Sequence, residues 1–156
     1  VGHVVYERVI ANMPETRALQ VELAKITKTY KDDIDGMKKK LDDKIKKYTA
    51  EQAQQTEDTN IQRAQEVKVD NSRIQQAEQA AYQDSQEKQN NKLVPIIGKA
   101  RKAIDDVAKA KQILYVLDAS AGRGLLVAAG EDLYDAVKVK LGLLPDQKQP
   151  TAPGQN

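Results

Sequence analysis

The stretch ILYVLDASAGRGLLVAAGEDLYDAVKVKLG, residues 113–142, is dense in Leu, Val and Ile. Residues 113–117 are apolar on both alternating faces, which predicts a strand that is covered on both sides. Turn residues fill 118–124, and a second apolar run at 125–129 predicts a second strand. Glu131 is expected to begin a helix that has acidic residues in its first turn and that ends at Gly142. The stretch therefore predicts a small α+β module.

This module carries more apolar surface than the rest of the chain is expected to cover. The N-terminal run Val4, Val5, Tyr6 predicts one further short strand. Three short strands make too small a sheet to be stable alone, yet full burial of each large apolar side chain is worth roughly 1.5–3 kcal/mol. We therefore expect a homo-oligomer that assembles through this module. The candidate interface residues are Val4, Val5, Tyr6, Leu114, Val116, Leu126, Val127 and Leu133.

The sequence before the module predicts a long helix with an eleven-residue apolar repeat. Apolar residues recur after Pro14 at spacings of three and four, and the other positions are mainly charged. Eleven residues over three turns is about 3.67 residues per turn, so the helix should pack along one narrow seam with little supercoil. The seam residues are Leu19, Leu23, Ile26, Tyr30, Ile34, Met37, Leu41, Ile45 and Tyr48.

A second helical pattern runs from Ile61 to about Gln112, which predicts one antiparallel hairpin over residues 14–112. We expect its turn at 56–60, where Thr59 and Gln62 match a capping box. Near the end of this second helix, apolar residues recur regularly at spacings of three and four. They are Leu93, Ile97, Ala100, Ile104 and Val107.

Three residues in these helices are expected to act as hinges, namely Gly36, Pro95 and Gly98. The predicted division is a discontinuous β-containing body at 1–13 and 113–144 and an arm at 14–112. The tail, 145–156, is predicted to be disordered because it has no apolar pattern.

No stretch carries the residues of a catalytic, metal or cofactor site. The chain has no Cys and a single histidine, His3, which leaves no zinc ligand set. KDDIDGMKKKLDD places Lys31 at the first ligand position of a calcium loop. GRGLLVAAG lacks the third glycine of a dinucleotide fingerprint, and no phosphate-binding loop of the ATPase type occurs. We therefore expect no enzyme, no cofactor and no ATP-driven cycle.

The run KKKLDDKIKK, residues 38–47, has six Lys against two Asp in a chain whose net charge is +2. The favoured interpretation is a solvated helix face, and the alternative is an electropositive patch that attracts an acidic partner. Stacking recognition of nucleic acid is not supported, because Tyr82 is the only aromatic residue between Gln52 and Gln89.

The order of the local patterns resembles a known family. GHVVYERV leads through ANMPE into the long hairpin, whose return carries LVPIIGKARKAIDDVAKAKQ. ILYVLDAS and LLVAAGEDLYDAVKVKLGLL follow. Over residues 1–144 this resembles the Skp/OmpH family of periplasmic outer-membrane-protein chaperones.

The resemblance implies a jellyfish-like homotrimer, in which strands of three subunits build a small β body and three coiled-coil arms surround a cavity. It implies an ATP-independent holdase whose clients are unfolded outer-membrane proteins, in the periplasm, with a signal peptide removed. Family members that are strongly basic suit contact with lipopolysaccharide or a membrane surface, whereas the near-neutral charge here does not favour such contact.

Clients are expected to meet the arm at Met37, Tyr48, Lys38, Lys39 and Lys40, where apolar and basic residues are mixed. The alternative for Met37 and Tyr48 is that they continue the seam between the two helices.

Two other functions fit the same pattern. One is a cytosolic prefoldin-like chaperone, which also joins helical hairpins to a β body. The other is a coiled-coil structural adaptor or spacer that is oligomerised by the sheet and binds one folded partner.

Overall fold

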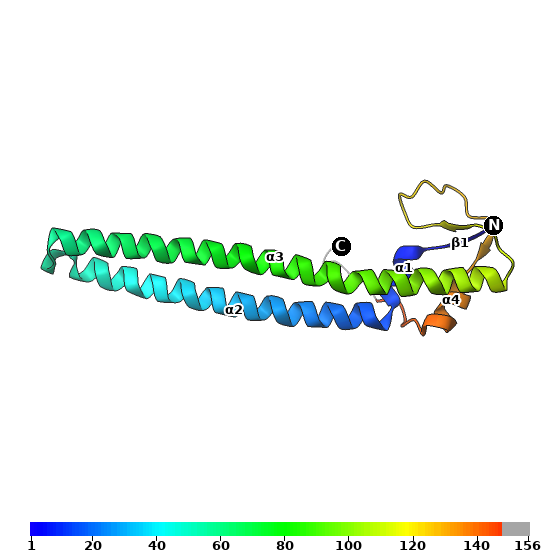
Figure 1. Cartoon of the computed structure of the whole chain (residues 1–156), viewed down its shortest axis with the longest axis horizontal. Helices are drawn as coiled ribbons and strands as arrows, with labels where there is room; N and C mark the ends of the chain where they lie inside the picture. The colour runs from blue at the N-terminus through cyan, green and yellow to red at the C-terminus, as the bar shows by residue number, and fades with distance from the viewer. Residues whose placement is uncertain (148–156) are drawn as a thin grey trace, which may run out of the picture. The chain divides into compact units, whose positions relative to one another are not determined.

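A computed structural model describes residues 1–147, and it divides into two compact units. The arm unit is Glu22–Gln89, and the sheet unit is Val1–Val21 together with the chain from Asn90 onward. The fold class is α+β, as predicted, with helices of 38 and 54 residues and a three-stranded sheet. The elements, labelled in Figure 1, are β1 (Gly2–Val4), α1 (Tyr6–Asn12), α2 (Pro14–Glu51), η1 (Gln52–Gln54), α3 (Glu57–Ala110), β2 (Val116–Asp118), β3 (Glu131–Asp132) and α4 (Tyr134–Leu141).

β1 is the central strand of the sheet, and it is parallel to both neighbours in the order β2-β1-β3. Gly2 lies opposite Val116 on one side and opposite Glu131 on the other. Both edges of β1 are therefore occupied by short strands from the C-terminal part of the chain.

The strand predicted at 113–117 begins later in the chain than expected, because Gln112 and Ile113 complete the C-terminal end of α3. Gln112 adopts a left-handed conformation with a φ of 57°, and the backbone N–H of Ile113 donates to the carbonyl oxygen of Ala108 at 2.8 Å. This arrangement satisfies the last carbonyls of the helix. β2 therefore begins at Val116.

The strand predicted at 125–129 is wrong, since these residues pair with no strand of the described chain. Glu131 was expected to begin a helix, yet it lies in β3 and α4 begins at Tyr134. Asp132 Oδ1 accepts a hydrogen bond from the backbone N–H of Tyr134 at 2.9 Å, which fixes that start. α4 ends at Gly142 as predicted, with a φ of 62°.

The core of the sheet unit forms where α1, α4 and the base of α3 meet the sheet. Met13, Val9, Leu133 and Val137 are its largest fully buried side chains. The predicted stripe on α3 is confirmed at Ala100 and Val107, whereas Ile96 is buried in place of Ile97, which is half-buried. The other buried apolar residues of the unit are Val4, Leu19, Ala103, Ala108, Tyr134 and Leu143.

In the arm unit α2 and α3 run antiparallel along one seam (Figure 1). The eleven-residue repeat on α2 is confirmed by the burial pattern, because its apolar positions are half-buried while nearly all positions between them are exposed. Ile45 is the exception among the seam residues of this unit and is exposed. Leu23, Ile26, Tyr30, Ile34, Met37, Leu41 and Tyr48 are the half-buried ones.

The capping box predicted at Thr59 and Gln62 is wrong. Thr56 precedes α3, and its Oγ1 accepts a hydrogen bond from the backbone N–H of Thr59 at 3.2 Å. Glu57 and Asp58 then stand in the first turn, where the helix dipole favours acidic side chains. Thr59 is therefore the third residue inside the helix.

Candidate assembly and client-contact surfaces

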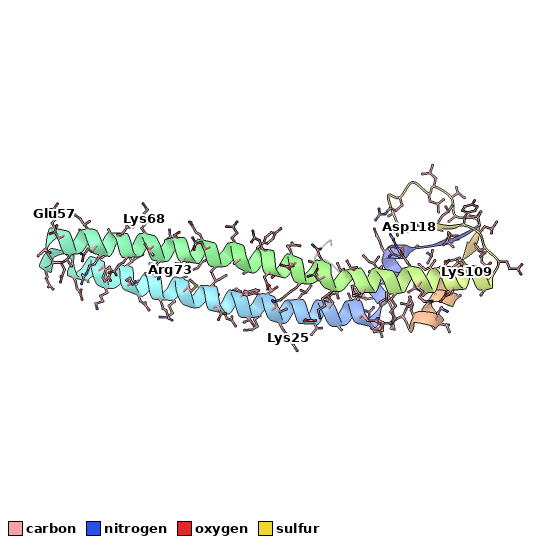
Figure 2. The ribbon with its side chains drawn as sticks, viewed as in Figure 1. Lys25, Glu57, Lys68, Arg73, Lys109 and Asp118 are labelled. Atoms are coloured by element: carbon pink, nitrogen blue, oxygen red, sulfur yellow. The ribbon has the colours of Figure 1, made fainter. Side chains whose placement is uncertain are left out.

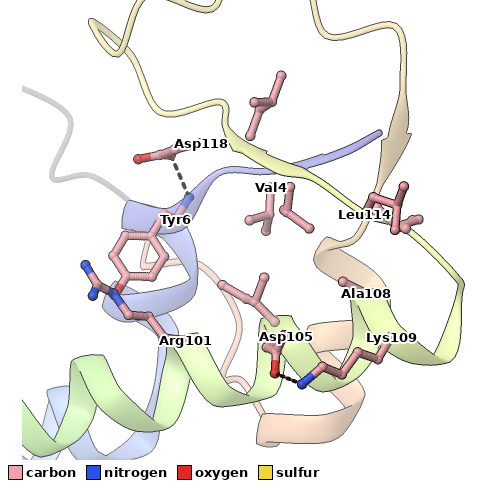
Figure 3. A pocket seen from close by; sticks show the side chains of 12 residues that line it. Val4, Tyr6, Arg101, Asp105, Ala108, Lys109, Leu114 and Asp118 are labelled. Carbon is pink, nitrogen blue, oxygen red and sulfur yellow. Dashed lines mark hydrogen bonds and ion pairs between the residues drawn. The ribbon is translucent and has the colours of Figure 1, made fainter.

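The sheet unit contains an open, mainly apolar groove of about 670 Å³ beside β2 and the last turns of α3 (Figure 3). Lys109 and Asp105, one turn apart on α3, pair at 2.6 Å on one side of it. The hydroxyl of Tyr6, on the opposite side, is buried and makes no hydrogen bond within the described chain. The lining residues that are apolar are Val4, Ile104, Ala108, Ile113, Leu114, Val116 and Leu117.

Several large apolar side chains of the sheet unit are exposed to solvent. Leu114 is 88% exposed, and Leu126 and Val127, in the segment that pairs with no strand, are 96% and 76% exposed. Tyr115 and Leu117 are also exposed. A protein of this size rarely leaves so many large apolar side chains together in water unless something covers them.

The predicted interface residues separate into two groups. Val4 and Leu133 are 2% and 0% exposed, so they serve the core of their own chain and present almost no surface to a partner. Val5, Tyr6 and Val116 are half-buried, and Leu114, Leu126 and Val127 are exposed. Alternating apolar residues in the sequence did not distinguish these groups, because burial depends on which elements fold against each strand.

The DAS triplet, residues 118–120, attaches the end of β2 to the start of α1. Asp118 Oδ1 accepts hydrogen bonds from the backbone N–H of Tyr6 at 3.2 Å and from the Oγ of Ser120 at 2.6 Å. Ser120 Oγ in turn accepts from the backbone N–H of Glu7 at 3.2 Å. Burial opposes ionisation of Asp118, but these hydrogen bonds outweigh it and lower the pKa of the carboxyl. The triplet thus supplies the cap that α1 lacks at Val5.

A polar cluster joins α1, α4 and the segment after α4. The buried Asn12 donates from Nδ2 to the hydroxyl of Tyr134 at 2.9 Å, and Arg17 donates to Asn12 Oδ1 at 2.8 Å. Arg8 lies over the Tyr134 ring at 3.8 Å and pairs with Asp146 at 2.8 Å, and these bonds lower the pKa of Asp146. Asp146 belongs to the tail predicted to be disordered, and the rest of that tail, 148–156, lies outside the described residues.

Among the residues predicted to contact clients, Met37 and Tyr48 lie along the seam between α2 and α3. Met37 and Tyr48 are half-buried. The hydroxyl of Tyr48 donates to Glu66 Oε2 at 2.5 Å, which raises the pKa of the tyrosine, and the guanidinium of Arg63 lies over its ring at 4.4 Å. Nothing in the local sequence pattern around Arg63 or Glu66 marks either residue as a partner of a residue on the other helix.

The lysine-rich run is largely neutralised by ion pairs. Lys39 pairs with Asp43 at 2.8 Å and Lys46 with Asp42 at 2.6 Å along α2, while Lys38 reaches Glu78 on α3 at 2.6 Å. Lys44 pairs with Asp70. Lys40 and Lys47 make no ion pair with the residues that the structure describes. Figure 2 shows charged side chains along the outer faces of both arm helices, with Lys25, Lys68 and Arg73 labelled.

The predicted hinge residues lie inside uninterrupted helices. Gly36 is within α2, and Pro95 and Gly98 are within α3. A Cβ added at Gly36 or Gly98 would meet no atom within 4 Å, so neither glycine is required for close packing. What Gly36 and Gly98 change is therefore the helical backbone at their own positions.

Within residues 1–147, no group of three or more His, Cys, Asp or Glu side chains is placed to hold a metal ion. No described helix is long and apolar enough to cross a membrane.

The model of the family described as "Outer membrane protein (OmpH-like)" matches residues 1–141, which cover the arm unit and most of the sheet unit. The chain belongs to the OmpH-like family. A search of curated proteins finds no match. Membership identifies the chain as a chaperone of the general Skp/OmpH type, from a family of chaperones associated with the periplasm and outer membrane. The resemblance stated from the sequence is thereby confirmed.

Proposed function

We propose that this OmpH-like chain is an ATP-independent holdase that keeps unfolded outer-membrane proteins from aggregating in the periplasm. The observation that carries the proposal is the family match, which extends over the arm unit and most of the sheet unit. The sequence has no phosphate-binding loop, which agrees with a chaperone that binds and releases clients without ATP.

The functional unit in this proposal is a trimer that assembles through the body, residues 1–13 and 113–144. Its support is the apolar surface that the single chain leaves in water at Leu114, Leu126 and Val127. The groove beside β2 and the free edge of β2 offer this surface a place to pack on a neighbouring copy.

Residues 14–112 form the arm, and clients contact it through many weak interactions. The arm unit offers half-buried apolar side chains such as Met37 beside exposed lysines such as Lys40. Met adapts its shape to different neighbours, which suits clients of varied sequence. Because each contact is small, a client leaves when it reaches a more stable folded state.

An aggregation assay tests the holding activity. An unfolded outer-membrane β-barrel protein is diluted from urea with and without the chain, and light scattering is followed. We expect scattering to be suppressed once three copies are present per client. A matched control is the Leu126→Asp chain at the same concentration, which we expect to fold but to protect poorly because it does not assemble. Undiminished scattering at a large excess of the unmodified chain would rule out the proposed function.

A further inference from the structure

The segment that follows α4 contacts the end of α1. Gly142, with a φ of 62°, ends α4, and Leu143 then enters the core of the sheet unit at 6% exposure. The backbone N–H of Leu144 donates to the carbonyl oxygen of Asn12 at 2.8 Å. Residues 143–146 form this segment, here called the clasp. The family match stops at residue 141 and so does not include the clasp.

The clasp binds a carbonyl oxygen that the break between two helices leaves without a helical partner. In a continuous helix the carbonyl of Asn12 would accept from the backbone N–H of Thr16. The chain breaks at Met13 and Pro14 instead, and the N–H of Thr16 donates to the carbonyl of Met13 at 3.1 Å. Asn12 is only 3% exposed, so an unpaired carbonyl there would be costly. The N–H of Leu144 supplies the missing bond.

The side chain of Asn12 joins the clasp to α4 and to the start of α2. Its Nδ2 donates to the hydroxyl of Tyr134 on α4 at 2.9 Å and to Asp146 of the clasp. Its Oδ1 accepts from Arg17, in the first turns of α2, at 2.8 Å. Arg17 also donates to the carbonyl oxygen of Pro145. One buried amide and one guanidinium thus connect three parts of the sheet unit.

We infer that the clasp locks the corner between α1 and α2, residues 12–17, onto α4 and thereby fixes the direction of the first turns of α2 relative to α4. Loss of the clasp, as by trimming of the C-terminal end, releases the start of α2 while α1 and α4 stay folded. This is a conformational device of the sheet unit, and it does not rest on the proposed function.

The buried members of the clasp and the corner carry this lock. Arg8 and Asp146 pair at 2.8 Å, but their side chains are 45% and 55% exposed, and exposed pairs contribute little by themselves. Leu143 and Asn12 are buried, so breaking their contacts leaves a cavity and an unpaired polar group. The lock therefore depends on the clasp as a segment and not on one ion pair.

Two chains of different length test the inference. One ends at Gln147 and keeps the clasp, whereas the other ends at Leu144 and keeps the buried Leu143 but lacks the partners of Arg17 and of the Asn12 amide. The chain has no Cys, so Gln20→Cys and Val139→Cys introduce the only labelling sites. Both positions are exposed and lie in the sheet unit, on α2 and on α4.

The distance between spin labels at these two positions is measured in labelled chain mixed with an excess of unlabelled chain, so that only distances within one copy contribute. We expect one narrow distribution for the full-length chain and for the chain that ends at Gln147. The chain that ends at Leu144 should give a broad distribution. Amide hydrogens of peptides within 6–17 should exchange roughly 5–30-fold faster in it.

Arg17→Met in the full-length chain separates the lock from effects of chain length. Methionine keeps a long apolar side chain but cannot donate to Asn12 Oδ1 or to the carbonyl of Pro145, so the distribution should broaden. Arg101→Met, at an exposed position of α3, is the matched control and should leave it narrow. If circular dichroism shows that the shorter chain does not fold, Arg17→Met decides alone. A narrow distribution in Arg17→Met, or in a folded chain that ends at Leu144, overturns the inference.

Discussion

Tyr6 and Asp118, 112 residues apart in sequence, are joined by a hydrogen bond from the backbone N–H of Tyr6 to Asp118 Oδ1 at 3.2 Å (Figure 3). This bond couples the first helix of the chain to the strand that follows the last turn of the long helix. The same carboxylate also orders the turn after β2 through Ser120. One side chain thus ties the start of α1 to the end of β2.

Asp118→Ala is expected to destabilise the chain by about 1–2 kcal/mol, the usual cost of losing a helix cap with its hydrogen bonds. Asp118→Asn keeps the acceptor oxygen and should retain most of that stability. The pKa of Asp118 is lowered, so its contribution is present above the ordinary aspartate pKa and is lost as pH falls through the lowered value. Urea unfolding at pH 7 and below pH 4 measures both effects. Equal midpoints for the two variants would contradict the capping role.

Leu133→Ala is expected to cost about 2–5 kcal/mol, because it empties a fully buried position in the core of the sheet unit. Thermal unfolding should show the loss even where the copies are dissociated by dilution. An unchanged transition temperature would show that Leu133 does not pack as described.

Leu126→Asp and Val127→Asp are expected to leave the fold of the single chain intact, since both side chains are exposed in it. We expect them to weaken self-association, because each places a charge on the proposed assembly surface. Sedimentation velocity over a range of concentrations gives the mass of the species present. A variant that sediments like the unmodified chain would remove its residue from the assembly surface.

Gly36→Ala is expected to stabilise the arm unit by about 0.5–1 kcal/mol, because alanine loses less backbone entropy in a helix and meets no neighbouring atom here. Amide hydrogen exchange of peptides within 22–51 should slow. Gly142→Ala is the contrasting variant, because a φ of 62° strains a residue with a Cβ. Faster exchange in Gly36→Ala would show that this glycine is needed for the helix path.

The helical period of the apolar residues predicted the two long helices from the sequence, whereas the capping box was placed at the wrong residues. The spacing of Leu23, Ile26 and Tyr30 is set by the geometry of one helix, and so it could be read locally. The strand at 125–129 could not be decided in this way, because a strand forms only where it pairs with another strand. Within the described chain β1 pairs with β2 and β3, and residues 125–129 pair with none of the three.

The candidate contact surfaces were harder to predict for the same reason. Arg63, Glu66 and Asp84 acquire their roles from residues on the opposite helix, which no local motif reveals. The core position of Leu133 likewise depends on the packing of α4 against the sheet. The Lys38 to Lys40 run could be recognised as a charge pattern in the sequence. Its pairing with acids could not be predicted without knowing the register of the hairpin.

Native mass spectrometry of the chain mixed with an unfolded outer-membrane β-barrel protein tests the central claim most directly, because it reports assembly and client binding in one mass. We expect a complex of three copies of the chain with one client, formed without ATP. Detection of the client only in unbound or aggregated form, beside a chain that stays monomeric, would contradict the account.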